Sequence, residues 1–277
     1  MPRVAVVGHV EWIEFARVPR LPRAGEIMHA TEWWQDAGGG GAVAAVQLAK
    51  LAGECDFFTA LAEDDLGRAA RDRLQQLGVT VFTAPRKGAQ RRGFVYLDGE
   101  GERTITILGE RIVPHGDDDL PWERLDGADA VYFTGGDESA LRQARRARKL
   151  VATPRAFDTL LASRVALDAL VRSAVDPGEQ QAEDELDPAP HLVVSTAGKK
   201  GGEWVGEDHT SHEWKAAELP GRKRDTYGAG DSFAAGLTFA LGAGMDPEDA
   251  LHVAARAGAS KLAGRAPYEN QLTAAEL

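Results

Sequence analysis

The sequence predicts an α/β fold whose sheet is predominantly parallel, and three observations support this prediction. First, Val4–Val7 and Cys55–Ala62 are apolar runs of strand length, as buried strands require. Second, residues 64–77 carry a helical pattern that separates the second run from a third one at 79–82. Third, more strand-length runs follow along the chain, at 129–133, 150–152 and 191–196. Strands that alternate with helices need crossover connections, which make neighbouring strands parallel.

Length, charge and cysteine content restrict the class of protein. The 277 residues suit one large α/β domain. The 32 basic and 43 acidic side chains give a formal net charge of −11, which argues against binding to nucleic acid or to an anionic membrane. Cys55 is the single cysteine, so we expect a buried thiol and a reducing compartment. No apolar run approaches the roughly 20 residues of a membrane span, and no charged-then-apolar leader is present, so we expect a cytoplasmic protein.

Two further segments are predicted to form extended structure. Residues 10–36 carry alternating apolar side chains, interrupted by prolines and a glycine. Residues 91–97 and 103–108 flank a Gly-rich turn, which is typical of a β-hairpin. Arg92 and Arg103 lie on this hairpin and could reach a carboxylate or phosphate of a substrate. An exposed arginine on a strand is more often simply solvated.

Helix starts are predicted from capping residues. Asp64 or Asp65 can cap the helix over 64–77. A later helix begins with Asp246-Pro247, which is a capping side chain followed by proline at the first helical position.

Residues 224–237 are the most informative stretch, because they form a loop that turns into a helix. Phe233 and Leu237 begin one apolar helical face. The unpaired amides of the first turn are then those of Gly228, Ala229, Gly230 and Asp231. Such a helix start attracts anions through its free donors and its dipole. The Asp231 carboxylate beside it can accept a proton from an attacking hydroxyl, although Gly-Ala-Gly before a helix also occurs as a purely structural cap.

The string Asp-Thr-x-Gly-Ala-Gly-Asp at 225–231, followed by Ser-Phe-x-x-Gly, resembles the signature of the PfkB sugar kinases, the ribokinase family. The resemblance covers nearly the whole chain. It implies a single ribokinase-like three-layer α/β/α domain over residues 1–277, with a small β lid from about 10–36 and 91–109. It also implies an ATP-dependent kinase that phosphorylates a sugar-like alcohol. The resemblance implies that Asp231 is the catalytic base. It implies that Gly228, Ala229 and Gly230 neutralise charge on the transferring phosphoryl group. It also places Thr226 in the nucleotide site.

The resemblance also assigns the glycine-rich stretch at 38–41 to the sugar pocket, although close packing of a helix on a strand would equally explain it. The expected pocket residues are Gly39, Gly40, Gly41 and Val43, with Glu11 and Arg92 from the lid. Val43 stands where the family has an asparagine, and valine cannot hydrogen-bond a hydroxyl. Glu11 stands near the usual position of a sugar-binding aspartate. His9 lies beside it, and a packed histidine without a substrate role is equally compatible. Both departures weaken an assignment to ribose or fructose.

Further resemblance concerns ATP and magnesium. Asp176 and Glu179 match the spacing of an Asn-x-x-Glu motif that organises Mg²⁺ through water, with an ordinary acidic loop as the alternative. Thr196, Gly198 and Gly201 match a turn that contacts the ATP phosphates. In the last long helix, Ala254 and Gly258 are expected to border adenine, unless they serve only helix packing.

Two other kinds of function stay open at this point. One is a kinase of the same fold that acts on a nucleoside, or on a pyridoxal-type or hydroxymethylpyrimidine-type ring alcohol. The other is a non-catalytic ligand-binding member of the family. The aromatic side chains expected in the lid would also suit a homodimer formed through the lid; they are Trp12, Phe15, Trp33 and Trp34.

Overall fold

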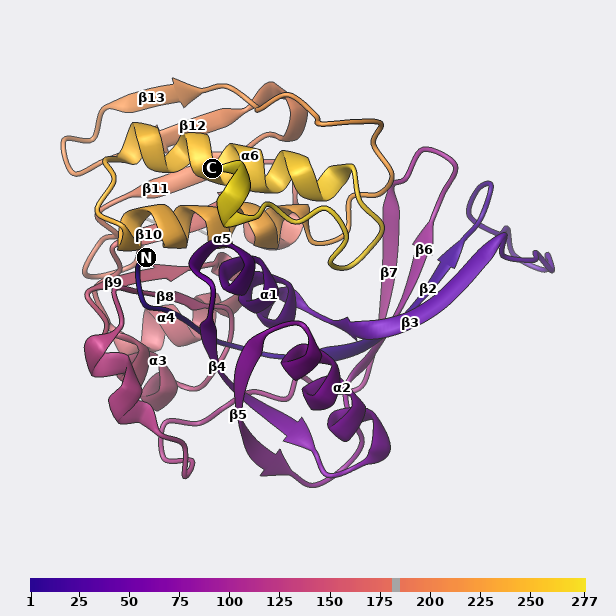
Figure 1. The fold of residues 1–277 in the computed structure, drawn as a ribbon, viewed down its shortest axis with the longest axis horizontal. Helices are drawn as coiled ribbons and strands as arrows, with labels where there is room; N and C mark the ends of the chain where they lie inside the picture. Colours follow the sequence, from indigo (N-terminus) through magenta and orange to yellow (C-terminus); the bar gives the residue numbers. More distant parts are fainter. Residues whose placement is uncertain (181–184) are drawn as a thin grey trace.

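The computed structural model describes residues 1–180 and 185–277, which form a large main sheet, a small second sheet and surrounding helices (Figure 1). Within these residues the main sheet has nine strands, in the spatial order β13 (Ser211–Trp214), β12 (Gly202–Val205), β11 (Val193–Thr196), β10 (Ala169–Ser173), β9 (Lys149–Ala152), β8 (Ala130–Phe133), β1 (Val4–Val7), β4 (Cys55–Ala62) and β5 (Val79–Arg86). The second sheet, called the lid below, has the order β3 (Glu32–Gly38), β2 (Glu11–Arg17), β6 (Arg92–Leu97) and β7 (Arg103–Leu108). The helices are α1 (Gly40–Ala52), α2 (Asp65–Gln76), α3 (Glu138–Ala144), α4 (Phe157–Ser163), α5 (Ala229–Gly242) and α6 (Pro247–Leu262).

Strand pairing in the main sheet confirms the predicted α/β fold. Every neighbouring pair from β5 across to β11 is parallel. Only β12 and β13, which complete one edge, run antiparallel. All residues of β1 are buried, as expected for a central strand of a parallel sheet with helices on both faces.

Apolar cores on both faces of the main sheet produce three layers. Val4 and Val6 of β1 belong to a core that includes side chains of α1, α5 and α6. Ala5 and Val7 point to the opposite face and join a core with α3 and α4. The alternation of side chains along a strand therefore places a helical layer on each side of the sheet.

Helix N-termini follow the predicted caps. Asp64 accepts a hydrogen bond from the N–H of Gly67 at 2.8 Å and so caps α2. Asp246 accepts from the N–H of Asp249 at 3.0 Å and caps α6. Each cap satisfies one of the N–H groups that a helix start leaves unpaired.

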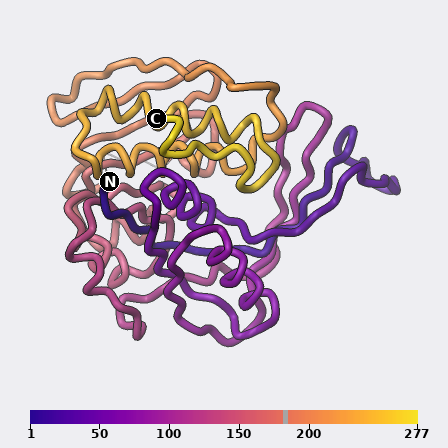
Figure 2. The backbone as a smooth tube through the Cα atoms, viewed as in Figure 1, coloured from indigo at the N-terminus to yellow at the C-terminus, as the bar shows by residue number. Residues whose placement is uncertain are grey.

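The lid is built from two separate parts of the chain (Figure 2). Strand β2 pairs antiparallel with β3 and parallel with β6, and β6 pairs antiparallel with β7. Alternation gives the lid two faces. Its inner face carries Ile13 and Phe15, which are buried, and the Phe15 ring packs edge-on against Tyr227 with centroids 5.0 Å apart. Its outer face carries Trp12 and its register partner Arg92.

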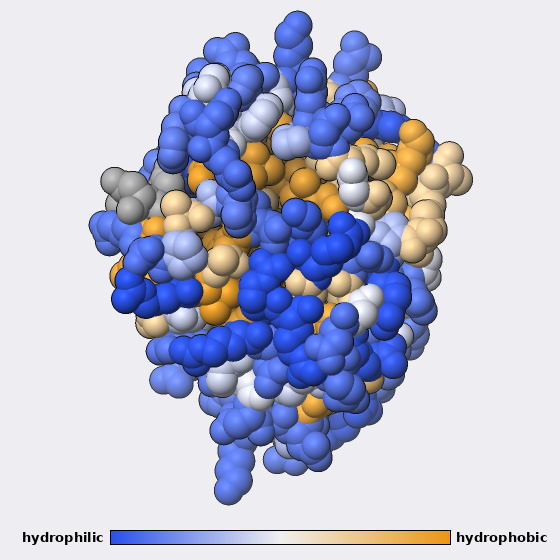
Figure 3. Space-filling view, turned by 90° about the vertical axis from the view of Figure 1, so that its left-hand side faces the viewer, coloured by the Kyte–Doolittle hydropathy of each residue, from blue (hydrophilic) through white to orange (hydrophobic). Residues whose placement is uncertain are grey.

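The surface on the side away from the lid is mostly hydrophilic, with small apolar patches between charged side chains (Figure 3). In the described part of the chain, none of the helices has the length and apolar character needed to cross a membrane.

Candidate active site

A buried ion pair holds the loop that precedes α5. Asp225 Oδ1 lies 3.5 Å from Lys261 Nζ, and both side chains are fully buried. Asp225 also accepts hydrogen bonds from the backbone N–H groups of Tyr227, at 3.2 Å, and Ala266, at 2.9 Å. Burial raises the pKa of Asp225 and lowers that of Lys261. The loop is thus fixed by desolvated charges before the helix begins, and these charges depend on each other.

Gly228 sets the start of α5. Its φ of 77° is in the left-handed region, which favours glycine. A Cβ atom at this position would also lie only 2.9 Å from Val43 Cγ1, so there is no room for a side chain. The first helical hydrogen bond runs from Ser232 N to Gly228 O at 2.9 Å. The amides of Gly230 and Asp231 therefore have no acceptor within the helix, and Gly230 is exposed.

Asp231 lies where two helix N-termini meet. It is half-buried in the first turn of α5, and a Cβ atom at Gly40, the first residue of α1, would lie 2.7 Å from its Oδ1. Burial raises the pKa of Asp231 to about 6, with smaller contributions from the charges of Glu179 and Glu11, while Arg103 and Arg155 oppose the rise. A carboxylate with this pKa is ionised at neutral pH but still basic enough to take a proton.

A buried histidine and glutamate lie on the other side of Gly40. Glu11 Oε1 lies 3.1 Å from Arg91 Nε and 3.8 Å from His9 Nε2. Burial raises the pKa of Glu11, and the charge of Arg91 opposes this. Burial, together with the charges of Arg111 and Arg91, lowers the pKa of His9 to about 3, so His9 is neutral at physiological pH.

Two more arginines approach this end of the site. Arg111 Nη1 donates a hydrogen bond to the backbone carbonyl of Arg155 at 2.9 Å. A Cβ atom at Gly135, just beyond β8, would lie 3.9 Å from Arg111 Cδ and 3.5 Å from His9 Nδ1. Arg155 Nε bonds Glu179 Oε1 at 2.8 Å, and its Nη2 forms an ion pair with Asp176.

The tip of the lid hairpin is bound to the loop before α5. Thr226 N donates to the Gly101 carbonyl at 3.0 Å. Arg103 Nη1 donates to the Thr226 carbonyl at 3.2 Å, and Lys223 Nζ lies 2.5 Å from Glu102 Oε1. Arg103 thereby lies on the Asp231 side of the lid, consistent with its effect on the pKa of that carboxyl.

Comparison with known protein families identifies the family of this chain. The family model described as pfkB family carbohydrate kinase matches residues 1–177 and 175–271. This chain belongs to the PfkB family. As a PfkB protein it is an ATP-dependent carbohydrate kinase.

Individual relatives agree with this placement. The kinase is similar to the ATP-dependent ribose-1-phosphate kinase of Halopiger xanaduensis, with 28% identity over 279 residues that cover 94% of this chain and 91% of the relative. Its structure resembles Thermotoga maritima ribokinase (TM-score 0.80, 21% identity, 100% and 98% of the two chains covered). It also resembles Arabidopsis thaliana ribokinase complexed with ribose and ATP (TM-score 0.78, 21% identity, 99% and 97% covered) and a microbiome-derived acarbose kinase (0.83, 21%, 99% and 97%). The structural likenesses confirm the ribokinase-like fold with its separate lid.

The predicted ATP-phosphate turn of this PfkB kinase lies between β11 and β12. Thr196 is the last residue of β11, and its Oγ1 donates to the Arg172 carbonyl at 3.3 Å. Gly198 and Gly201 have φ values of 59° and 82°. A Cβ atom at Gly201 would also lie 2.1 Å from the Trp214 carbonyl, which explains the glycine without a ligand. Contact of this turn with ATP stays a prediction.

The predicted adenine residues lie at the packing surface between α5 and α6. Ala254 is fully buried, and a Cβ atom at Gly236 would lie 2.9 Å from its Cα. A Cβ atom at Gly258 would lie 3.3 Å from the Ala229 carbonyl. Close approach of the two helices accounts for both small residues. Ala254 has no exposed surface in this structure, and contact of Ala254 or Gly258 with adenine stays a prediction.

Contacts within the protein account for three of the predicted pocket residues without a ligand, so their place in the pocket stays a prediction. Val43 is fully buried against Gly228 and belongs to the core. A Cβ atom at Gly41 would lie 2.6 Å from the His9 carbonyl, which indicates backbone packing. Arg92 lies on the outer face of the lid, opposite in direction to Glu11, and forms an ion pair with Glu14. By contrast, Gly39 and Gly40 do border Glu11 and Asp231.

Sequence reasoning missed the residues that complete the site. Arg91 directly precedes Arg92, and the alternation of the lid would have placed it beside Glu11 if the register had been known. Arg111 follows β7 in a segment without periodic pattern, so no local signal identified it. Lys261 was overlooked because a lysine on an amphipathic helix is usually exposed, whereas here it is fully buried.

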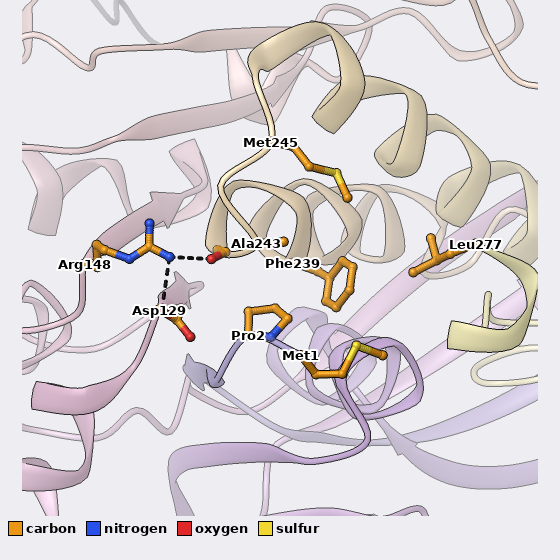
Figure 4. Close-up of a pocket in the computed structure, with 9 residues that line it drawn as sticks. Met1, Pro2, Asp129, Arg148, Phe239, Ala243, Met245 and Leu277 are labelled. Carbon is orange, nitrogen blue, oxygen red and sulfur yellow. Dashed lines mark hydrogen bonds and ion pairs between the residues drawn. The ribbon is translucent and has the colours of Figure 1, made fainter.

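One pocket among the described residues lies away from this site (Figure 4). It measures about 570 Å³ and is lined by Phe239, Met245 and both chain ends, Met1 and Leu277. It lies at the C-terminal end of α5, whereas Asp231 lies at the N-terminal end. The distance along the axis is roughly 16 Å, so this cavity takes no part in the chemistry around Asp231.

Proposed function

We propose that this kinase transfers the γ-phosphoryl group of ATP to a hydroxyl of a sugar-type acceptor, with Asp231 as general base. The acceptor hydroxyl gives its proton to the Asp231 carboxylate while its oxygen bonds to the γ-phosphorus. The bond between that phosphorus and the β,γ-bridging oxygen breaks, and ADP leaves. The observation that carries the proposal is the half-buried Asp231 at a helix N-terminus, with a pKa of about 6.

The amides of the first turn of α5 are the proposed site for the transferring group. They belong to Gly228, Ala229 and Gly230. The Gly230 amide has no acceptor within the helix, and the Ala229 amide donates only a long hydrogen bond of 3.5 Å to the Thr226 carbonyl. These donors lie at the positive end of the helix dipole, where charge develops on the phosphoryl oxygens. Arg103 adds a cation from the lid, next to Asp231, and supports the same role.

Magnesium is the metal that the family implies, and Asp176 and Glu179 are its proposed partners. Their oxygens are hard ligands suited to Mg²⁺. Arg155 already binds both carboxylates, and Glu179 Oε2 accepts from Ser173 N at 2.8 Å. These residues therefore fit a metal held through water better than one bound directly. When bound, Mg²⁺ would neutralise phosphate charge, and Arg155 would keep the two carboxylates oriented.

The acceptor is proposed to enter between Asp231 and the pair His9 and Glu11. Glu11 offers an acceptor oxygen for sugar hydroxyls, and neutral His9 offers a ring nitrogen. The Halopiger xanaduensis relative is named for ribose 1-phosphate. This supports including pentose phosphates, next to free sugars and nucleosides, among the acceptors that are tried first.

The test is ADP release from ATP by the wild-type kinase and Asp231→Asn across these acceptors. We expect wild-type turnover with at least one sugar-type acceptor, and a loss of kcat of about 10²-fold or more in the variant, as for removal of a general base. Near-normal turnover by Asp231→Asn would refute the role of the base. Binding of ATP and acceptor without ADP release by the wild type would instead favour a non-catalytic protein, and turnover only with nucleosides would favour a nucleoside kinase.

We further propose a homodimer formed through the lid. Strand β7 is an edge strand with all six residues exposed. Large apolar side chains of the lid are also exposed, namely Trp33 at 61%, Ile105 at 40%, Ile107 at 39% and Leu108 at 46%. Exposed apolar area on an open sheet edge favours pairing with a second copy. Light scattering should give twice the mass of the 29.7 kDa chain; a monomer at high protein concentration would contradict the dimer.

A further inference from the structure

Lys261, in the last turn of α6, is a charged side chain that has no contact with water. Among the described lysines it is the only one that is fully buried. Its ammonium lies 3.5 Å from Asp225 Oδ1 and donates to the Gly264 carbonyl at 3.4 Å. A well-packed apolar pair is often at least as stable as a buried ion pair. Stability alone therefore does not account for this ammonium.

The Asp225 carboxylate connects the ammonium to the two helix N-termini beside Asp231. It accepts from the amide of Tyr227 at 3.2 Å, and Tyr227 directly precedes Gly228, the N-cap of α5. The Tyr227 hydroxyl in turn accepts from the amide of Gly39 at 2.9 Å, at the N-cap of α1. The position of this one carboxylate therefore influences where both helix starts lie.

A second cation near Asp225 belongs to the lid and lies farther away. Arg17 Nη2, on strand β2, is 3.9 Å from Asp225 Oδ2. Lys261 is instead carried by α6, which packs directly against α5, since a Cβ atom at Gly236 would lie 2.9 Å from Ala254 Cα. The ammonium is thus the cation whose position does not depend on the lid.

We propose that Lys261 is a positioning residue for phosphoryl transfer, whose ammonium acts through Asp225 to hold the amides at the start of α5 in place. Such amides stabilise developing charge only if they are already oriented when that charge appears. Misplacement by about 1 Å can cost about 10²-fold in rate. This inference rests on the proposed function and adds to it a residue that lies outside the reacting groups.

The test replaces the lost ammonium by one from solution. Lys261→Ala removes the charge and leaves space beside Asp225 and the Gly264 carbonyl, where a dissolved ammonium ion can supply the same charge and N–H donors. Lys261→Met removes the charge but fills the space, so it is the matched control for entry of the ion. Lys50→Met is the control for position, because the Lys50 ammonium donates to the Tyr268 carbonyl at 2.7 Å, in the segment that follows α6, and not to Asp225.

The measurement is kcat and KM with ATP and with the acceptor, among free pentoses, pentose phosphates and nucleosides, that the wild type turns over fastest. Each protein is assayed in ammonium chloride and in tetramethylammonium chloride at equal ionic strength, at a temperature where circular dichroism shows it to be folded. Tetramethylammonium has the same charge but no N–H donor and is too large for the vacated space. Urea unfolding in the two salts gives a second readout that needs no turnover.

In tetramethylammonium chloride, kcat of Lys261→Ala should be about 10- to 100-fold below that of the wild type, with KM for the acceptor within about threefold, because orientation of the amides matters most in the transition state. Ammonium should raise this kcat about fivefold or more and should stabilise Lys261→Ala against urea, as a ligand of the folded state does. It should do neither for Lys261→Met. The wild type and Lys50→Met should have similar kcat values in both salts.

Two results would overturn the positioning role. One is wild-type kcat in Lys261→Ala, and the other is a loss of kcat that ammonium restores equally in Lys261→Met. If Lys261→Ala does not fold, the double variant Lys261→Met with Asp225→Asn decides, because it removes both charges together. Near-wild-type kcat in this variant would refute the need for the ammonium, whereas a loss of about 10-fold or more would support it.

The unfolding readout separates this inference from the proposed function. Wild-type kcat in Lys261→Ala would reject the positioning role and leave the kinase mechanism intact. Stabilisation of Lys261→Ala by ammonium, in a protein whose wild type releases no ADP, would retain the cation position beside Asp225 and reject the kinase mechanism.

Discussion

The two sides of Asp231 are formed by different kinds of chemical group. On the side proposed to bind the phosphoryl group, the groups are backbone amides and glycines of one continuous segment, Gly228 to Asp231. On the side proposed for the acceptor, they are polar and charged side chains from separate segments, namely His9, Glu11, Arg91 and Arg111. A backbone site constrains neighbouring residues in sequence, whereas a side-chain site needs only that distant segments meet in space. The first side therefore leaves a motif in the sequence and the second does not.

The largest effect is expected from Asp231→Asn, which should lower activity while it raises stability. Activity should fall by 10²- to 10⁴-fold. Folding raises the pKa of this carboxyl from 3.8 to about 6, so ionisation costs the folded state stability as pH rises through that range. The variant should therefore be more stable at pH 7, by at most about 3 kcal/mol, in urea unfolding. Loss of both activity and stability would indicate a structural role instead.

Lys261→Met should show how much the buried ion pair between Lys261 and Asp225 contributes to the stability of the protein. This pair holds the loop that precedes α5. Removal of the ammonium leaves the buried Asp225 with only the more distant guanidinium of Arg17, whose Nη2 lies 3.9 Å from Asp225 Oδ2, and we expect a loss of about 3–5 kcal/mol in the free energy of unfolding. Addition of Asp225→Asn should recover part of this loss. The control Lys223→Met removes a partly exposed lysine from the loop that carries Asp225 and should cost about 1 kcal/mol or less. Equal effects of both lysine variants would contradict the role of the buried pair.

The smallest expected effect is a shift in the pH profile. The acid limb of kcat/KM should have a midpoint near 6, from Asp231, and His9 should add no second step because its pKa is about 3. Arg103→Gln removes a cation that opposes the rise in the Asp231 pKa, so it should move the limb to higher pH. Arg92→Gln, on the outer face of the lid, should leave the limb in place. If the acid limb does not move in Arg103→Gln, the charge of Arg103 on the lid has no influence on the pKa of Asp231.

The same contrast explains which parts of the molecule were predictable. The buried strands of the main sheet and the caps of α2 and α6 follow from local patterns, because apolar runs and capping aspartates are encoded within a few residues. The face occupied by Arg92 depends on the register between β2 and β6, which are far apart in sequence. The burial of Val43 and Ala254 likewise depends on how α1 and α6 pack against α5. Such contacts are set by tertiary packing, which a single sequence does not display.

The attachment of the lid hairpin to the catalytic loop limits how the lid can move. Thr226 donates to Gly101 and accepts from Arg103, only a short way before the glycine that opens α5. An outward swing of β6 and β7 must either break these bonds or drag the loop with it. We therefore expect admission of the acceptor to be coupled to alignment of the amides proposed to bind the phosphoryl group. An open lid would then disfavour transfer of the phosphoryl group from ATP to water.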